Sequence, residues 1–97
     1  MKKCYIAGRI TGLSKMEYMA NFDYATIEVT KLGYTAINPA FIHEGKKWSW
    51  IRLMVADIRL LLPCKAIFMQ RNWKESRGAK IEHCVAKILR KTIIYQK

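Results

Sequence analysis

The sequence has few cysteines and no long hydrophobic run, and both absences exclude classes of protein. Its three cysteines form no Cys-x-x-Cys pair and no Cys/His cluster, which argues against a zinc site or a disulfide scaffold. The longest apolar stretch, Trp48 to Leu62, contains Arg52, Asp57 and Arg59 and is too polar for a membrane span. We therefore expect no metal, no cofactor and no membrane partner. The basic start of the chain lacks the apolar run of a signal peptide, so we expect a cytoplasmic location.

Acidic side chains are also scarce: seven Asp and Glu stand against 18 Lys and Arg, for a net charge of +11. The excess is uneven, because residues 1–45 carry five basic and four acidic side chains, whereas residues 46–97 carry thirteen basic and three acidic ones. Such a field attracts nucleic acid, an anionic membrane surface or a phosphorylated small ligand. The alternative is a surplus of solvated lysines that only aids solubility.

The length and the hydrophobic fraction of 52% predict one folded domain over residues 1–97. Apolar runs predict strands at residues 3–7, 34–37, 66–69 and 92–95, and periodicity predicts helices over 14–33, 48–62 and from Ser76 onward. Three strand–helix–strand units predict an α/β fold, a parallel sheet with helices on both faces. The loops at 8–14, 38–47 and 70–77 then lie at the carboxyl edge of the sheet, where such folds bind ligands.

Helix signals and apolar stripes predict the ends and the buried faces of the helices. Ser14 and Glu17 have capping-box spacing, Pro63 ends the second helix, and Ser76 caps the third. The predicted core residues are Tyr18, Phe22, Ala25, Val29 and Leu32 in the first helix, Ile51, Met54, Val55, Ile58, Leu61 and Leu62 in the second, and Ile81, Val85, Ile88 and Leu89 in the third.

Glu82 is the sharpest candidate for chemistry. It falls in the second turn of the third helix, beside the apolar stripe, with no basic residue three or four positions away. Gly78, on the same side, costs helix stability of about 1 kcal/mol relative to alanine and leaves open space above the carboxylate. Because the positive end of a helix favours the ionised form, Glu82 suits a nucleophile. The alternative is a boundary glutamate that reaches solvent.

Asp57 is a second candidate, at the edge of the second helix's apolar stripe. Desolvation there would raise its pKa, as suits a general acid. The alternative is an aspartate paired with a lysine of another element. Two carboxyl groups from different helices near one sheet edge would be the equipment for cleaving a glycosidic bond through a covalent intermediate.

The loop after the first strand, Gly8-Arg9-Ile10-Thr11-Gly12, offers backbone N–H groups, a hydroxyl and a cation at the start of a helix. It could hold a phosphate or a sugar, although it is neither a dinucleotide fingerprint nor a Walker loop, and the alternative is an ordinary turn. Trp73 could stack on a base or close its loop over the core, and Ser76 could be only a cap. His43 and His83 favour solvated roles.

Several of these residues form a pattern that resembles the nucleoside 2-deoxyribosyltransferase superfamily. The most specific part is Trp73…Ser76…Gly78-Ala79…Glu82, and Tyr5-Ile6-Ala7-Gly8…Thr11-Gly12 is second. Asn21-Phe22, Asn38-Pro39-Ala40, Asp57-Ile58…Leu61 and Cys64 complete the pattern, which spans nearly the whole chain. The resemblance is strongest to a short phage- and prophage-associated branch of largely unknown function, and so implies a bacterial host or a phage as the source.

The resemblance implies a flavodoxin-like fold that cleaves the N-glycosidic bond of deoxynucleosides or their 5′-monophosphates. Glu82 matches the glutamate that attacks the anomeric carbon, and Asp57 matches the aspartate that handles the proton of the leaving base. Ser76, Gly78 and the residues from Gly8 to Gly12 match positions near sugar or phosphate, Tyr5 loosely matches an active-site aromatic, and the enzymes are dimers or larger. Arg9 stands where this branch commonly has proline, which favours an anionic ligand.

Three hypotheses follow from the sequence. The first is an N-glycosidase or deoxyribosyltransferase that uses Glu82 and Asp57, with Arg9, Thr11, Gly12 and Ser76 holding phosphate and ribose. The second is a module that binds a nucleotide without turning it over. The third, ranked last because no recognised nucleic-acid motif is present, is nucleic-acid binding through the basic second half.

Overall fold

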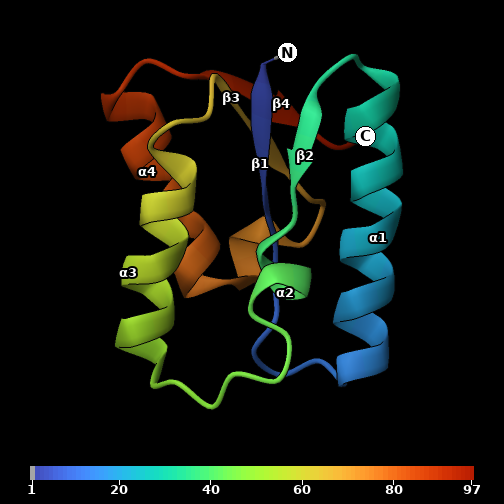
Figure 1. Ribbon diagram of the computed structural model, residues 1–97, viewed down its shortest axis with the longest axis vertical. Helices are drawn as coiled ribbons and strands as arrows, with labels where there is room; N and C mark the ends of the chain where they lie inside the picture. The colour runs from blue at the N-terminus through green and yellow to red at the C-terminus, as the bar shows by residue number, and fades with distance from the viewer. Residues whose placement is uncertain (1) are drawn as a thin grey trace.

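The computed structural model describes residues 2–97, which form a four-stranded parallel sheet with helices around it (Figure 1). The strands are β1 (Lys3–Ala7), β2 (Thr35–Ile37), β3 (Ala66–Met69) and β4 (Thr92–Tyr95), in the order β2-β1-β3-β4. All three pairings are parallel. The chain reverses its direction across the sheet between β1 and β3, so the carboxyl ends of these two strands form the switch point where such sheets bind ligands.

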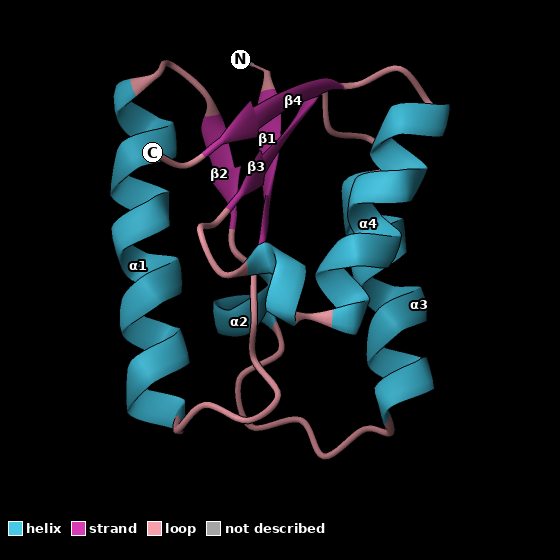
Figure 2. Cartoon of the chain, turned by 180° about the vertical axis from the view of Figure 1, so that it is seen from behind, coloured by secondary structure: helices cyan, strands magenta, loops and turns pink. Residues whose placement is uncertain are grey.

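The helices make the fold a three-layer sandwich. They are α1 (Lys15–Lys31), α2 (Pro39–Ile42), α3 (Trp50–Leu61) and α4 (Arg77–Ile88), with a 3-10 turn η1 (Trp73–Glu75) before α4. Helix α1 covers one face of the sheet, while α3 and α4 lie side by side on the other (Figures 1 and 2). The predicted flavodoxin-like α/β fold is therefore confirmed. Within residues 2–97, no helix is long and apolar enough to cross a membrane.

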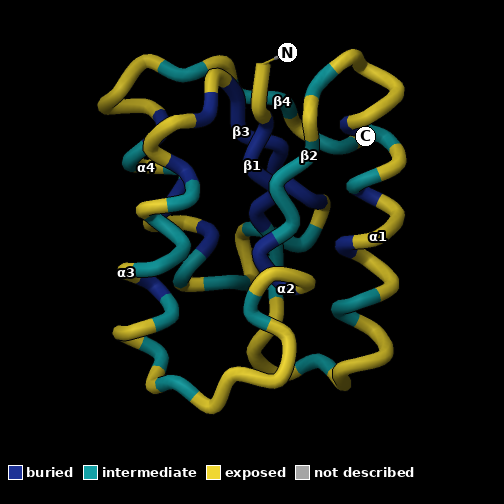
Figure 3. Tube along the Cα trace, viewed as in Figure 1, coloured by how far each residue is buried: buried dark blue, intermediate teal, exposed yellow. Residues whose placement is uncertain are grey.

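The sheet separates two hydrophobic cores, and β1 contributes side chains to both. Successive side chains of a strand point to opposite faces, so Cys4 and Ile6 pack on the α1 side with Phe22, whereas Tyr5 and Ala7 pack on the α3–α4 side. Strands β1 and β3 are buried on both faces apart from Lys3, and most of the exposed residues lie in the helices and the loops (Figure 3). The central strands hold Tyr5 rigidly beneath α4.

The helix caps follow the sequence signals closely. The hydroxyl oxygen of Ser14 accepts from the backbone N–H of Glu17 at 3.2 Å, and that of Ser76 accepts from the N–H of Ala79 at 3.1 Å. Two boundaries differ from prediction. Helix α3 begins at Trp50 rather than Trp48, because Ser49 caps it, and the segment predicted as a plain loop at 38–47 contains α2, capped by the side chain of Asn38.

The predicted buried faces of α3 and α4 are partly wrong. Each helix is rotated so that part of its apolar stripe faces outward: Ile51, Val55 and Leu62 are exposed at α3, as are Ile81, Ile88 and Leu89 at α4. Leu32, after α1, is exposed as well. The buried positions of α4 are instead Ala79, Glu82 and Ala86. Two alanines let α4 approach the sheet closely, and this contact turns Glu82 toward β1.

Candidate active site

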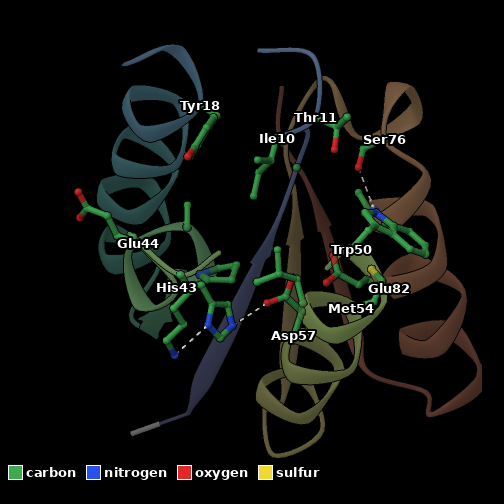
Figure 4. Close-up of a pocket in the computed structure, with 18 residues that line it drawn as sticks. Ile10, Thr11, Tyr18, His43, Glu44, Trp50, Met54, Asp57, Ser76 and Glu82 are labelled. Atoms are coloured by element: carbon green, nitrogen blue, oxygen red, sulfur yellow. Dashed lines mark hydrogen bonds and ion pairs between the residues drawn. The ribbon is translucent and has the colours of Figure 1, made fainter. Parts of the chain in front are cut away.

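A pocket of about 190 Å³ lies at the carboxyl edge of the sheet, between the loop after β1, α2, α3 and the start of α4 (Figure 4). Its lining brings together six of the residues predicted from sequence: Gly8, Thr11, Asp57, Ser76, Gly78 and Glu82. The switch point of the sheet and the predicted chemical residues therefore coincide.

Glu82 is held at the inner wall of this pocket by a buried tyrosine. The Tyr5 hydroxyl donates a hydrogen bond to Oε2 of Glu82 at 2.6 Å, and only 4% of Glu82 is exposed. Tyr5 itself is 1% exposed and is not among the residues that line the pocket. It lies behind Glu82 and fixes the direction of the carboxyl group. The alternative prediction, a boundary glutamate that reaches solvent, is wrong.

The protonation of Glu82 differs from the sequence prediction. Burial raises the pKa of Glu82 from 4.5 to about 8; the hydrogen bond from Tyr5 lowers it in part, and the neighbouring Asp57 adds to the rise. The prediction of an ionised carboxylate near the positive end of α4 is therefore wrong for this structure. Desolvation of a side chain that is only 4% exposed outweighs a helix-end effect that contributes at most about 2 kcal/mol.

Asp57 faces the same pocket from α3. Burial raises its pKa from 3.8 to about 7, as predicted for a general acid. Its Oδ1 lies 3.0 Å from Nε2 of His43, but the angles do not form a hydrogen bond, and neither atom has another hydrogen-bond partner among residues 2–97. The alternative of a lysine partner for Asp57 is not realised in the described chain. Two buried polar atoms thus stand together in the pocket wall, able to engage a polar group of a ligand.

His43 and Arg77 are site residues that sequence reasoning missed; Arg77 lines the second cavity described below, and His43 lines the pocket itself. The side chain of His43 is 11% exposed, and burial first, then Lys46, lower its pKa. It lies directly after the four-residue helix α2, whose start at Asn38-Pro39 turns the chain back over the pocket. The available sequence signal was Asn38-Pro39, which can cap a short helix. Such a helix places His43 directly after one helical turn that follows β2.

A second cavity of about 340 Å³ adjoins the first and shares with it Thr11, Trp50, Ser76 and Gly78. Arg9 enters this cavity; its Nε donates to the carbonyl of Thr11 at 3.1 Å, and its Nη1 lies 3.8 Å from a carboxylate oxygen of Glu75. The guanidinium of Arg77, which also lines the cavity, lies 4.1 Å from the centre of the Trp50 ring. Two arginines beside a capped helix start make this cavity suited to an anion.

Three further predicted residues have roles other than those expected. Gly12, with φ of +90°, forms the turn against which the Arg9 guanidinium lies and lines neither cavity. Gly78 gives close packing as well as space, because a Cβ there would lie 3.0 Å from Sδ of Met54. Trp73 stacks on His83, with ring centroids 4.3 Å apart, and lines neither cavity. Its alternative role, closing the loop, fits this position.

The fold and the pocket define an α/β sandwich with a two-carboxyl site at its switch point. Residues 2–95 match one family model, and the protein belongs to the family that this model describes, Domain of unknown function (DUF4406). No curated protein matches it closely enough in sequence to count as a relative.

Among solved structures, the chain is similar to a 2-desoxiribosyltransferase from Leishmania mexicana. The superposition has a TM-score of 0.73 at 17% sequence identity, and covers 98% of this chain and 63% of the other. The protein thus spans less than two thirds of the length of that structure. The likeness establishes a shared fold, in line with the superfamily that the sequence pattern resembles.

The raised pKa of Glu82 predicts a pH-dependent effect of Glu82→Gln on stability. Between pH 4.5 and 8 the folded protein holds a proton on Glu82 that the unfolded chain releases, so wild-type stability falls as pH rises through this range. The amide cannot ionise. We therefore expect the free energy of unfolding of Glu82→Gln, relative to that of wild type, to rise by roughly 2–4 kcal/mol from pH 4.5 to pH 8. Urea unfolding at both pH values measures this difference. Asp23→Asn, an exposed amide substitution on α1, is the control, and an equal effect of Glu82→Gln at both pH values would contradict the assignment.

Proposed function

We propose that the protein cleaves the N-glycosidic bond of a deoxynucleoside 5′-monophosphate, with Glu82 as nucleophile and Asp57 as general acid. The observation that carries this proposal is the pair of carboxyl groups, a buried one from α4 and a half-buried one from α3, that face one pocket while Tyr5 orients the first of them. This equipment suits retaining glycoside chemistry. The fold shared with a 2-desoxiribosyltransferase supports the same class of reaction.

The proposed reaction has two steps. An oxygen of the ionised Glu82 attacks C1′, the bond from C1′ to the base nitrogen breaks, and the departing base takes the proton of Asp57. Water then attacks C1′, transfers a proton to Asp57 and frees Glu82, so that the products are a free base and deoxyribose 5-phosphate. A second base in place of water would give transfer instead of hydrolysis.

The order of the two pKa values determines which form of the site reacts. The reaction needs Glu82 ionised and Asp57 protonated, yet the pKa of Glu82 is about 8 and that of Asp57 about 7. With one proton shared between the two groups, the reactive arrangement is the less populated one, and the apparent pKa values belong to the pair. His43 beside Asp57 can stabilise its ionised form after the proton has left.

The phosphate and the sugar are assigned to the second cavity. Arg9 and Arg77 supply positive charge, and Ser76 and Thr11 supply hydroxyl groups where the two cavities meet. The carboxylate of Glu75 near Arg9 would be displaced by the phosphate, because the two anions compete for one guanidinium. This arrangement places C1′ toward Glu82 and leaves the base near Asp57 and His43.

The outward apolar stripes of α3 and α4 support a homodimer as the working form. Ile51, Val55, Ile81 and Ile88 are exposed on two helices that lie side by side on one face of the molecule. A second copy on this face would remove these side chains from water, which stabilises the dimer by about 25 cal/mol per Å² of apolar surface buried.

Placement in the phage and prophage branch of the superfamily stays a prediction.

A nucleotide-binding module without turnover is the second candidate, because the same two cavities would hold the ligand. It is separated from the enzyme by the chemical fate of the ligand. Tight binding of a deoxynucleotide that is recovered unchanged would support the module. Nucleic-acid binding would appear instead as affinity for generic DNA that falls steeply with salt.

Base release is the first prediction from this proposal. Wild-type protein incubated with a panel of deoxynucleosides and their monophosphates should release free base, measured by liquid chromatography. Glu82→Gln should reduce release to the detection limit, and Asp57→Asn should slow it by about 10²–10⁴-fold. The exposed substitution Asp23→Asn should leave the rate unchanged. Absence of release from every substrate by correctly folded wild type would refute the enzymatic function, and release unaffected by Glu82→Gln would refute the site.

The pH profile of kcat/KM is the second prediction. The rate should rise as the pair loses its first proton near pH 7 and fall as it loses the second near pH 8, which gives a bell with a maximum between these values. Initial rates at substrate concentrations well below KM, in a series of buffers between pH 5 and 10, measure the profile. A rate that stays constant from pH 5 to 10 would contradict the assignment of both carboxyl groups.

Removal of the phosphate-facing cation is the third prediction. Arg9→Ala should raise the KM for a deoxynucleoside monophosphate on the order of tenfold, because one charge-assisted hydrogen bond is lost. The KM for the corresponding nucleoside, which has no phosphate, should stay the same. Lys31→Ala removes an exposed cation at the far end of α1 and serves as the control. An equal rise for both substrates would exclude Arg9 as a phosphate ligand.

A further inference from the structure

A third cavity lies outside the active site, between α1 and the segment that follows β3. Its volume is about 260 Å³, and it is lined by Asn21, Tyr24, Gln70, Arg71, Asn72 and Gln96. None of these residues lines the two cavities described above. Four of the six side chains are carboxamides, and the function proposed for Glu82 and Asp57 uses none of them.

Gln70 gives this cavity an unsatisfied polar group. The residue is 2% exposed, and its Nε2 finds no hydrogen-bond partner among residues 2–97. A buried amide N–H without a partner costs about 1–3 kcal/mol, so its retention calls for an explanation. The backbone of Gln70 is fixed, since its N–H donates to the carbonyl of Ala7 at 3.0 Å. The residue is thus fixed through its backbone, and its side-chain Nε2 keeps an unused donor.

The neighbouring side chains are arranged by bonds that leave other groups available. Both ends of the Gln96 amide are hydrogen-bonded. Its Oε1 accepts from the N–H of Arg71 at 2.9 Å, and its Nε2 donates to Glu28 at 2.7 Å. Asn72 uses its Oδ1 to accept from the N–H of Arg9 at 3.1 Å, which directs its NH₂ group elsewhere. Hydrogen bonds therefore orient both Gln96 and Asn72 in the wall of the cavity.

Helix α1 contributes the more open wall. Asn21 and Tyr24 are three residues apart, on one face of α1, and both are exposed, Tyr24 to 60%. A tyrosine ring offers a flat surface for stacking, and a carboxamide offers a donor and an acceptor side by side. One aromatic face with several carboxamides matches a planar ligand whose edge carries neighbouring donors and acceptors.

We propose that this third cavity is a second binding site, for a free nucleobase or a heterocycle of the same class. The ring stacks on Tyr24, and its polar edge pairs with Asn21, with the NH₂ group of Asn72 and with the Gln70 amide. Carboxamides recognise adenine and other bases by such paired contacts. A phosphate would find only one cation here, Arg71, whose Nε already donates to the carbonyl of Lys97.

The second site is in contact with the active site through the loop after β1. The Gln70 amide lies so close to Gly8 that a Cβ on Gly8 would be 2.5 Å from Nε2, and any larger residue there would force the amide to move. The adjacent Arg9 is tied to Asn72 by the hydrogen bond described above. A base that engages Gln70 and Asn72 therefore acts on both residues that open the phosphate-facing loop.

Titration with free bases tests the proposal, which does not depend on the glycosidase function. Adenine, cytosine and uracil are added separately to isotope-labelled protein, and backbone amide signals are followed by NMR. At least one base should shift the signals of Asn21, Tyr24 and Gln70 together with those of Gly8 and Arg9. Tyr24→Ala should weaken its binding on the order of tenfold, because base–aromatic stacking is lost, and Asn21→Ala should weaken it as well. Both substitutions are exposed and compatible with folding.

Two controls keep this result specific. Asp23→Ala, exposed on the same helix and absent from the cavity lining, should bind the base as wild type does. Asp57→Asn alters the active-site pocket and should not weaken binding at the second site. Shifts confined to His43 and Asp57 would mean that the base occupies the active site only, and would overturn the proposal. So would the absence of any shift with all three bases at millimolar concentration.

Discussion

The hydrogen bond from Tyr5 to Glu82 is the interaction on which the rest of the site depends. It joins the central strand β1 to α4 inside the core, at 2.6 Å, with both side chains nearly inaccessible to water. A carboxyl group in such a place needs a partner, and a tyrosine hydroxyl supplies one without adding a charge. The close contact of α4 with the sheet follows from the same requirement. Small residues, Ala79 and Ala86, flank Glu82 on that face.

The buried carboxyl also explains why the aliphatic residues of α4 face outward. If Ile88 and its neighbours packed on the sheet, Glu82 would turn to solvent and lose both its tyrosine and its raised pKa. The helix instead buries Glu82 on its inner face and leaves an apolar stripe, including Ile81 and Ile88, at the surface. A buried polar residue beside exposed aliphatic ones is a local departure from the usual pattern, of the kind expected at a functional site.

Much of this could be predicted from the sequence, but not the rotation of the helices. Strand runs and the caps at Ser14 and Ser76 are local signals, so the sheet and the helix starts were predictable, and the loop order then brought Glu82 near Asp57. Which side of a helix is buried depends on its partners, and the wide apolar stripes left that open. The protonation of Glu82 depends on desolvation in the complete fold. His43 was missed because a four-residue helix leaves almost no periodicity.

The loop after β1 lies between the active-site cavities and the segment that follows β3. Gly8 and Arg9 border the cavities beside Glu82. The same two residues contact the segment after β3: Gly8 packs against Gln70, and the N–H of Arg9 donates to Oδ1 of Asn72. Parallel neighbours end at the same edge of a sheet, so the segments after β1 and β3 must contact each other at the switch point. The contact between these two segments is therefore a consequence of the strand order.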